Sequence, residues 1–479
     1  GNPGSPSTTF LKKNSKYSDD SVASLMEAEE ALRTIKDPLL RRDIISLGYV
    51  HGLTSSGNRV RFTLRLPSPA SPHGEELAGK CREALLTLDG IDTVEIETAW
   101  EVPRLPALEA PTTPAALAQV KQIIAVASGK GGVGKSTIAV NLAFACAQAG
   151  ARVGMLDIDV YGPSVPTMLG LRDHSLAGGQ QGVLEPVTAH GLKVMSMGFL
   201  TTKETPLVWR GPIASQLVQQ FLGSVAWGEL DFLFVDLPPG TGDIQLTLTQ
   251  AVPLSGAIIV TTPQEVAHTI AEKGLRMFQQ VKVPILGIVE NMAYYHCPEC
   301  GHNDPIFREG GGVAAAQKLD IPLLARIPLN SSIAAAMDAG EPIAEGGIGD
   351  AFKALAGEAM ARASATALGE ALNPAAPQEL AIAAGGAVQV KWRDGAEQVI
   401  PAHTLRSECP CAGCVDEFSG EKLLQPEQIP TDIVVASTAS IGRYAVRFDF
   451  SDGHNSGIYE FARLRAIGDN ASDAAAFEV

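Results

Sequence analysis

The sequence predicts an α/β protein with a central, doubly wound parallel sheet, a small α+β domain before it and a small β-rich domain after it. Three observations support this. Between residues 120 and 370, short runs that are apolar on both faces alternate with helical patterns, as a parallel sheet covered on both sides requires. Pro- and Ala-rich stretches interrupt the pattern on either side. A chain of 479 residues is also too long for one hydrophobic core.

Shifts in composition divide the chain into seven segments. They are, in order, a disordered tail at 1–20, an α+β domain at 21–101, a Pro-rich linker at 102–119, the central domain at 120–370, a linker at 371–382, a β-rich metal-binding domain at 383–466 and a loose tail at 467–479.

The elements of each domain follow from hydrophobic periodicity. In the first domain, a helical pattern ends at Pro38, a second helix covers 75–88, and strands are expected at 44–50, 60–66 and 94–98. The central domain has six buried strand patterns, at 123–127, 153–157, 232–236, 257–261, 285–289 and 323–327. The last domain has strand patterns at 388–392, 445–450 and 457–461.

Charge and hydropathy exclude several functional classes. The chain has 37 Lys and Arg against 53 Asp and Glu, which gives a net charge of −16. An acidic surface repels phosphate backbones, so we expect no general nucleic-acid binding. No apolar run approaches the roughly 18 residues of a membrane span, and the first twenty residues contain no apolar segment typical of a secretory signal.

The strongest motif lies between the strand at 123–127 and a following helix. Its residues are Gly129, Lys130, Gly131, Gly132, Val133, Gly134, Lys135, Ser136 and Thr137. Glycines allow successive backbone N–H groups to surround phosphate oxygens, and the helix N-terminus adds favourable partial charge. This is the strand–loop–helix context of a P-loop, with Lys135 expected at the β/γ-phosphates of ATP and the Ser136 hydroxyl on Mg²⁺.

Three carboxylates lie at or just after the ends of two predicted strands. Asp236 closes the run at 232–236, in the position of a Walker-B carboxylate that holds Mg²⁺ through water. Asp157 ends the strand at 153–157 and Asp159 follows it, and either is a candidate for orienting the attacking water. The alternative for each is a helix cap or turn residue.

The P-loop run GKGGVGKST resembles the deviant Walker A motif of the MinD/ParA-type ATPases. Further motifs, DIDVYGPSVPTMLG, WRGP, DLPPGTGD, TTPQEVA, GIVENMAYYHCPECG and IPLLARIPLNSSI, resemble the Mrp/ApbC branch of iron–sulfur cluster carriers. The resemblance covers about 250 residues. It implies ATP hydrolysis, a homodimer in which Lys130 reaches the partner's nucleotide, and an Asn291 that reads the adenine. A buried turn asparagine is an equal alternative for Asn291.

Two tight clusters contain five of the seven cysteines, and an odd number of cysteines does not suit a disulfide scaffold. Cys297 and Cys300 are spaced to share one metal centre, but a four-iron cluster takes four cysteines. Two subunits related by a two-fold axis would supply four. The carrier resemblance implies this bridging [4Fe–4S] cluster. The alternatives are a zinc site with His302 as a third ligand and a redox dithiol. Cys146, outside both clusters, is expected in the core.

The N-terminal segment resembles the small assembly domain that accompanies iron–sulfur carriers, on the runs 31–38 and 47–48. Ser71 occupies the position where that family often has a reactive cysteine. Serine is a poor iron ligand beside thiolate, so we expect this domain to dock partners and not to hold a cluster through Ser71. Cys81 is expected to be structural.

The second cysteine cluster is Cys409, Cys411 and Cys414, which needs a fourth ligand. We expect His454 and not His403. The segment resembles the N-terminal domain of γ-butyrobetaine hydroxylase-like proteins, and this implies a Cys₃His zinc site. Zinc is favoured over iron or a transferable cluster at this position.

Together the three parts resemble a three-domain, plastid-type form of the Mrp carriers. The resemblance implies an ATP-hydrolysing scaffold, with slow turnover, that receives a cluster from a donor and transfers it to apo-proteins. A MinD/ParA-like positioning ATPase and a zinc-dependent metallochaperone or regulatory ATPase are the alternatives. The expected compartment is the chloroplast stroma, with a transit peptide already removed because the chain starts without Met; a bacterial cytoplasm is the alternative.

Overall fold

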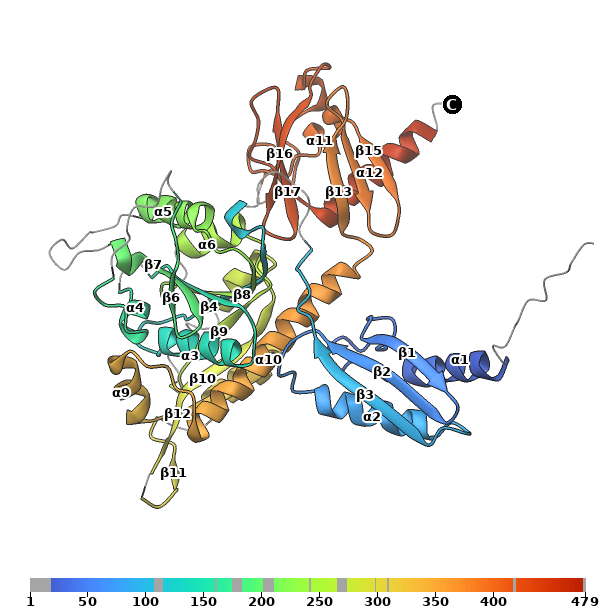
Figure 1. Cartoon of the computed structure of the whole chain (residues 1–479). Helices are drawn as coiled ribbons and strands as arrows, with labels where there is room; N and C mark the ends of the chain where they lie inside the picture. The colour runs from blue at the N-terminus through green and yellow to red at the C-terminus, as the bar shows by residue number, and fades with distance from the viewer. Residues whose placement is uncertain are drawn as a thin grey trace, which may run out of the picture. The chain divides into compact units, whose positions relative to one another are not determined.

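The computed structural model describes residues 19–106, 115–159, 162–174, 183–200, 211–240, 243–264, 274–297, 299–307, 310–416 and 419–476. The chain divides into two compact units (Figure 1). The first contains residues 1–66 and 73–101, and the second contains residues 67–72 and 102–479. No helix among the described residues is long and apolar enough to cross a membrane.

The first unit is a three-stranded sheet in the order β1-β2-β3, with two helices packed against it. Strands β1 and β2 are antiparallel, whereas β2 and β3 are parallel. Alternate residues of β2 are buried, as expected for a sheet with one covered face. The elements are α1 (Asp19–Arg33), β1 (Val50–Ser56), β2 (Arg59–Leu66), α2 (Gly74–Leu86) and β3 (Thr93–Trp100).

The strand expected at 44–50 is wrong, because most of these residues form a turn that leads into β1. The Asp43 carboxylate accepts a hydrogen bond from the Ser46 amide (2.8 Å), and Gly48 has a φ of +69°. Ile44 and Tyr49 are buried by this turn, which explains their apolar pattern without a strand. The initial helix begins at Asp19, two residues inside the expected tail, and residues 1–18 of that tail lie outside the described residues.

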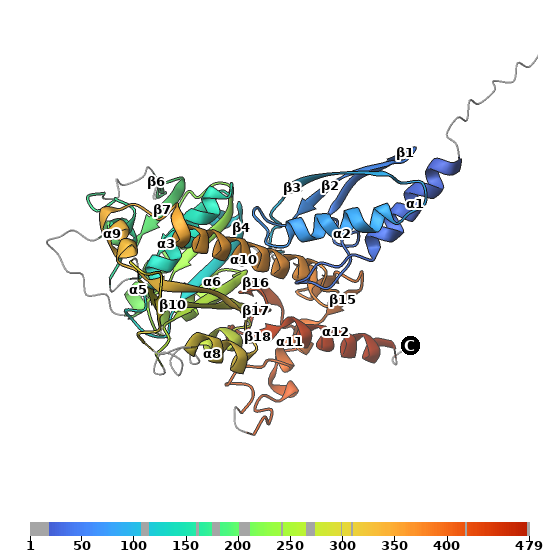
Figure 2. The same cartoon turned by 90° about the horizontal axis from the view of Figure 1, so that it is seen from below.

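The second unit contains a nine-stranded sheet in the order β11-β10-β9-β4-β8-β5-β7-β6, with β12 also paired to β10. All six predicted buried strands are present, and they pair with one another in parallel. Within this sheet, the described strands pair antiparallel only between β6 and β7 and between β10 and β11. Helices α3 and α10 pack together on one side of the sheet, and α5 and α6 pack together on the other (Figures 1 and 2).

The bounds of these elements are β4 (Val120–Ala127), α3 (Lys135–Gln148), β5 (Val153–Asp157), α4 (Val165–Met168), β6 (Val187–Ala189), β7 (Leu192–Ser196), α5 (Gly211–Ser224), β8 (Leu230–Asp236), α6 (Asp243–Ala251), β9 (Gly256–Thr261), β10 (Ile285–His296), β11 (Asn303–Asp304), α8 (Gly311–Leu319), β12 (Leu323–Leu329), α9 (Ser331–Ala339) and α10 (Gly346–Ala371).

The C-terminal part of the second unit has two three-stranded antiparallel sheets around one core that includes Trp392, Phe448 and Tyr459. Its elements are β13 (Pro377–Ile382), β14 (Val388–Trp392), β15 (Glu397–Ile400), α11 (Ala402–Ser407), β16 (Val435–Ile441), β17 (Ala445–Phe450), β18 (Ile458–Glu460) and α12 (Phe461–Ala476).

Two expected connecting segments are structured instead. Residues 377–382 of the expected linker form β13, which pairs with β14. The expected tail from 467 continues α12 to Ala476, because Leu464 and Ile467 lie three residues apart on one helical face and are both buried. Within the expected linker at 102–119, Val102 and Leu105 are also buried, and residues 107–114 lie outside the described residues.

Candidate functional site

The P-loop lies between β4 and α3, as its sequence predicts. Gly132 and Gly134 both have positive φ angles, +80° and +79°, and Gly134 is the N-cap of α3. Such a backbone turns successive N–H groups toward the same side and suits phosphate oxygens. The Asn291 Nδ2 donates to the Val133 carbonyl oxygen at 2.9 Å, so the middle of β10 is hydrogen-bonded to the loop.

The Asn291 side chain leaves no room for a side chain at position 134, so this position requires glycine. A Cβ at that position would lie 2.2 Å from Asn291 Nδ2, in a left-handed conformation that L side chains rarely adopt. Asn291, 6% exposed, is thus a buried partner of the loop. Its predicted role in reading adenine stays a prediction.

A charged cluster lies at the start of α3. The Lys135 Nζ donates to Asp236 Oδ1 at 2.5 Å, and the Ser136 hydroxyl donates to Asp236 Oδ2 at 2.5 Å. The Lys135 Nζ is also 3.8 Å from the Asp159 carboxylate. Burial raises the pKa of Asp236, and the Lys135 ammonium acts against that shift. The hydroxyl and the carboxylate expected to hold Mg²⁺ are therefore adjacent.

Asp157 is fully buried, and both of its oxygens accept hydrogen bonds. Oδ1 accepts from the Asp159 amide (3.1 Å), whereas Oδ2 accepts from the Ser196 hydroxyl (2.9 Å) and the Val165 amide (3.4 Å). Burial, followed by the negative charge of Asp236, raises the pKa of Asp157 to about 7. Asp157 thus holds together the loop after β5, and of the two candidates it is Asp159 whose carboxylate lies near Lys135.

Lys130 is exposed, and its backbone carbonyl accepts a hydrogen bond from the Ser128 hydroxyl (3.0 Å). An exposed side chain at the start of the P-loop is available to a second subunit. Contact with a partner's nucleotide stays a prediction.

The first cysteine pair lies on a hairpin that extends β10 beyond the sheet. Strand β10 ends at His296 and pairs with β11, and the Cys297 amide donates to the His302 carbonyl at 2.9 Å. Cys297 is partly exposed and Cys300 is exposed. Hydrogen bonds, chiefly from the Cys300 amide, lower the pKa of the Cys297 thiol, which favours the thiolate that binds metal. Pro298 between them lies outside the described residues.

The second cluster brings together Cys409, Cys411, Cys414 and His454, whose ligand atoms all lie within 4.8 Å of one another. In the part of the chain that the structure describes, it is the one group of three or more such residues that converges in this way, so neither His403 nor His302 belongs to one. The three sulfurs are 3.1, 3.5 and 3.8 Å from His454 Nε2. Zinc bonds of about 2.3 Å to sulfur and 2.0–2.1 Å to nitrogen in a tetrahedron imply separations of about 3.5 Å, so these donors fit a four-coordinate ion.

Models of known protein families match all three parts of the chain. The model of the ParA family, described as NUBPL iron-transfer P-loop NTPase, matches residues 119–361. The chain belongs to this family. Two further models match the flanking parts: an iron–sulfur cluster assembly protein at 26–98 and the γ-butyrobetaine hydroxylase-like N-terminal domain at 382–465.

Relatives of this P-loop NTPase have names that refer to iron–sulfur clusters. An iron-sulfur cluster carrier protein from Synechocystis is 48% identical over 316 residues, which are 65% of this chain and 89% of the relative. The chloroplastic Fe-S cluster assembly factor HCF101 from Oryza sativa is 37% identical over 456 residues, 92% of this chain and 84% of the relative. Among solved structures, an ADP complex of a nucleotide-binding protein from Archaeoglobus fulgidus is 43% identical, with a TM-score of 0.43, and covers 48% of this chain and 90% of that one.

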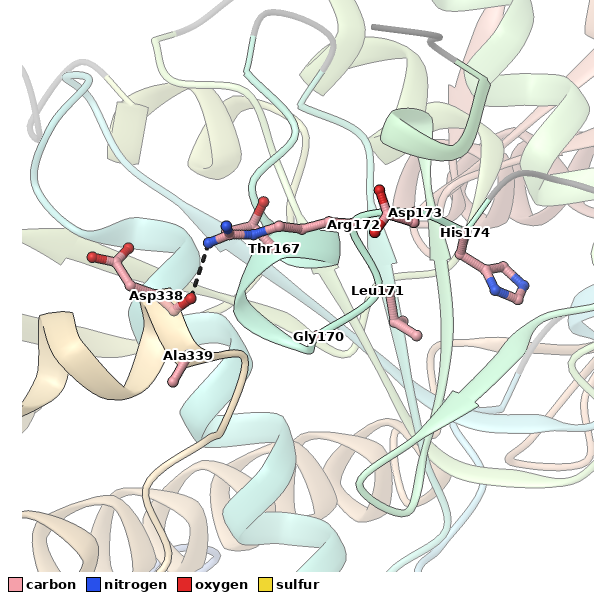
Figure 3. Close-up of a pocket in the computed structure, with 8 residues that line it drawn as sticks. All are labelled: Thr167, Gly170, Leu171, Arg172, Asp173, His174, Asp338 and Ala339. Carbon is pink, nitrogen blue, oxygen red and sulfur yellow. Dashed lines mark hydrogen bonds between the residues drawn. The ribbon is translucent and has the colours of Figure 1, made fainter.

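An open pocket of about 460 Å³ in this NTPase lies between the C-terminal ends of α4 and α9 (Figure 3). The Arg172 guanidinium donates to the Asp338 carbonyl oxygen at 2.9 Å and so satisfies a carbonyl in the last turn of α9. None of the P-loop or cysteine residues line this pocket.

Sequence reasoning missed Ser196, the hydroxyl partner of Asp157. It ends β7, a five-residue strand that hydrophobic periodicity did not identify, and it meets Asp157 through the parallel pairing of β5 and β7. The polar residue at the end of the apolar run LKVMS was the available signal. Cys81 and Cys146 are fully buried, as expected for structural cysteines, and Ser71 is partly exposed.

Proposed function

We propose that this NTPase hydrolyses ATP slowly and carries a [4Fe–4S] cluster, held by Cys297 and Cys300 of two subunits, to apo-proteins. The observation that carries the proposal is that one strand, β10, contacts the P-loop through Asn291 and continues directly into the hairpin that contains Cys297 and Cys300. The names of its relatives, iron-sulfur cluster carrier protein and Fe-S cluster assembly factor, support the same assignment.

The nucleotide chemistry is assigned to residues at the carboxyl edge of the sheet. The P-loop amides and Lys135 would bind the phosphates, where Lys135 offsets the charge that develops on the γ-phosphate as water attacks it. Ser136, and Asp236 through water, would hold Mg²⁺, which would supply positive charge that polarises the phosphates. We assign Asp159 to the attacking water, because its carboxylate lies 3.8 Å from the Lys135 Nζ, whereas Asp157 is fully buried.

The dimer is proposed from the number of cysteine ligands that a four-iron cluster takes. Each chain offers two accessible cysteines on its hairpin, one partly and one fully exposed, and a four-iron cluster takes four cysteine ligands. A second copy would therefore supply the other two. The exposed Lys130 is assigned to the partner's nucleotide. Nucleotide state would then shift the population of the dimer that binds the cluster.

The C-terminal Cys₃His site is proposed to hold structural zinc, since its four donors leave no open position for chemistry. We propose the chloroplast stroma as the compartment, because the chloroplastic rice relative matches 92% of this chain and the Synechocystis carrier 65%. A bacterial cytoplasm is the alternative. The partners would be a cluster donor and apo iron–sulfur proteins.

The test is anaerobic reconstitution of the full chain with iron and sulfide, with iron, sulfide and zinc counted per dimer. The Cys297→Ala/Cys300→Ala variant is expected to lose the four-iron absorption and keep its zinc. Cys411→Ala is the matched control, expected to lose zinc and keep the cluster. The loaded native chain should then activate an apo-protein that depends on [4Fe–4S]. Zinc at both cysteine clusters with no labile sulfide would refute the carrier proposal and favour a zinc-dependent regulatory ATPase.

A further inference from the structure

A buried arginine lies against the Cys₃His cluster. Arg406, in α11, is 7% exposed, and its Nη1 donates to the Cys414 sulfur at 3.2 Å. Its Nε donates to Asp452 Oδ2 at 2.8 Å, and its guanidinium lies 6.0 Å from the centre of the Phe450 ring. An arginine is rarely buried this deeply unless its charge is paired, so these contacts account for its position.

The same arginine connects the two segments that provide the ligands. Asp452 uses its other oxygen, Oδ1, to accept a hydrogen bond from the His454 amide at 3.0 Å. A continuous chain of hydrogen bonds therefore runs from the Cys414 sulfur through Arg406 and Asp452 to the backbone of His454. Because guanidinium donors are held in a rigid plane, this chain fixes the separation of the two ligands.

Charge gives the arginine a second role. Three thiolates and a neutral histidine on a divalent ion leave a net charge of −1, and the guanidinium at Cys414 offsets it. Its N–H···S hydrogen bond also draws electron density from the sulfur. A thiolate held in this way is a weaker nucleophile and a less reactive ligand, which suits a metal that stays in place.

We propose that Arg406 is a positioning residue of the Cys409–Cys411–Cys414–His454 metal site, which orients Cys414 and His454 and balances the charge of three thiolates on a divalent ion. This inference rests on the metal site assigned above. Mutation of a residue that hydrogen-bonds a metal ligand typically lowers the metal affinity 10–100-fold. We therefore expect Arg406→Gln to weaken zinc binding by about 10–100-fold.

The experiment uses the full chain, stripped of metal and loaded with Co²⁺ or Zn²⁺. The variants are Arg406→Gln and Arg406→Lys, and Arg463→Gln is the control. Arg463 is an exposed arginine of α12 that hydrogen-bonds the Glu408 carbonyl oxygen and none of the ligand atoms. Zinc affinity is measured by competition with a chromophoric chelator. The Co²⁺ spectrum reports the ligand geometry in its ligand-field bands and the sulfur donor strength in its thiolate-to-cobalt charge-transfer band.

Arg406→Gln is expected to keep the tetrahedral ligand-field bands and move the charge-transfer band to longer wavelength, because a sulfur without its N–H donor is easier to oxidise. Arg406→Lys keeps the positive charge but lacks the planar set of guanidinium donors, and it should bind zinc more tightly than Arg406→Gln. If the glutamine variant does not fold, the shift of the charge-transfer band in the lysine variant tests the proposal instead. Affinities within twofold of native and an unshifted band would overturn the role of Arg406. Failure of the native chain to bind one divalent ion at this site would instead overturn the site itself.

Discussion

Replacing Asp157 with asparagine tests the buried carboxyl at the end of β5. Burial and the charge of Asp236 raise its pKa from 3.8 to about 7 in the folded chain. The folded chain therefore keeps a proton that the unfolded chain releases. The stability that depends on this proton is fully present below about pH 3.8 and is lost as the pH rises through about 7. The asparagine of Asp157→Asn cannot ionise, so this variant should not lose stability in this way as the pH rises.

The magnitude follows from the size of the shift. Each pKa unit corresponds to about 1.36 kcal/mol, so a shift of about 3 units costs the native chain about 4 kcal/mol above pH 7, of which about 2.5 kcal/mol is lost between pH 5 and pH 8. The asparagine Nδ2 would face the Val165 amide, which now donates to Oδ2, and this cost is independent of pH. Subtracting the change in unfolding free energy that Asp157→Asn causes at pH 5 from the change at pH 8 removes that pH-independent cost.

The assay is differential scanning calorimetry of the chain without nucleotide or Mg²⁺, at pH 5, 6, 7 and 8, which resolves the central domain from the flanking parts. A domain of 150–250 residues shifts its Tm by about 2–4 °C per kcal/mol. The Tm of Asp157→Asn relative to native should therefore rise by about 5–10 °C between pH 5 and pH 8. Asp350→Asn removes an exposed carboxylate of α10 and is the control. If native and variant Tm values run parallel across this range, the carboxyl does not carry the proton and the reasoning is refuted.

Three further changes test the packing and the P-loop. Gly340→Ala should lower the Tm by the equivalent of about 2–4 kcal/mol, because its Cβ would lie 2.6 Å from the Cα and N of Gly170 at a φ of +79°; an unchanged Tm would contradict this close contact. Glu290→Gln should cost about 1.5–3 kcal/mol in calorimetry, because it weakens a buried, charge-assisted bond to Arg326 (2.9 Å), and restoration by Arg326→Gln in the double variant would confirm the pairing. Lys135→Ala should weaken ATP binding at least tenfold by isothermal titration, and native affinity would remove the lysine from the phosphate site.

The parts of the fold that could be predicted are those whose signal is local. The six central strands are apolar on both faces, and the P-loop glycines indicate their own backbone geometry. The short strands β6, β7 and β11, of three, five and two residues, were missed because only pairing with a neighbour makes them strands. The turn at 44–49 resembles a strand in sequence because apolar residues buried by a turn have the same composition.

The same limit applies to the site. Motif spacing predicts Lys135 and Asp236, but no spacing predicts that Ser196 donates to Asp157 across 39 residues of sequence. Arg406 stands three residues before Cys409 and was overlooked, because its contact with Cys414 exists only after α11 has formed and packed. Local chemistry can be recognised from sequence, whereas the partners that tune it come from tertiary packing.

Strand β10 contains both the residue that contacts the P-loop and the segment that leads to the cysteine hairpin. Asn291 holds the Val133 carbonyl, and six residues later the same strand has led into Cys297. Between them Met292 has a φ of +54°, and the pairing with β12 shifts register between Asn291 and Tyr295. Any displacement of Val133 upon nucleotide binding must therefore break the hydrogen bond to Asn291 or move β10. In the second case the displacement reaches the irregular segment around Met292, which lies between Asn291 and the cysteine hairpin.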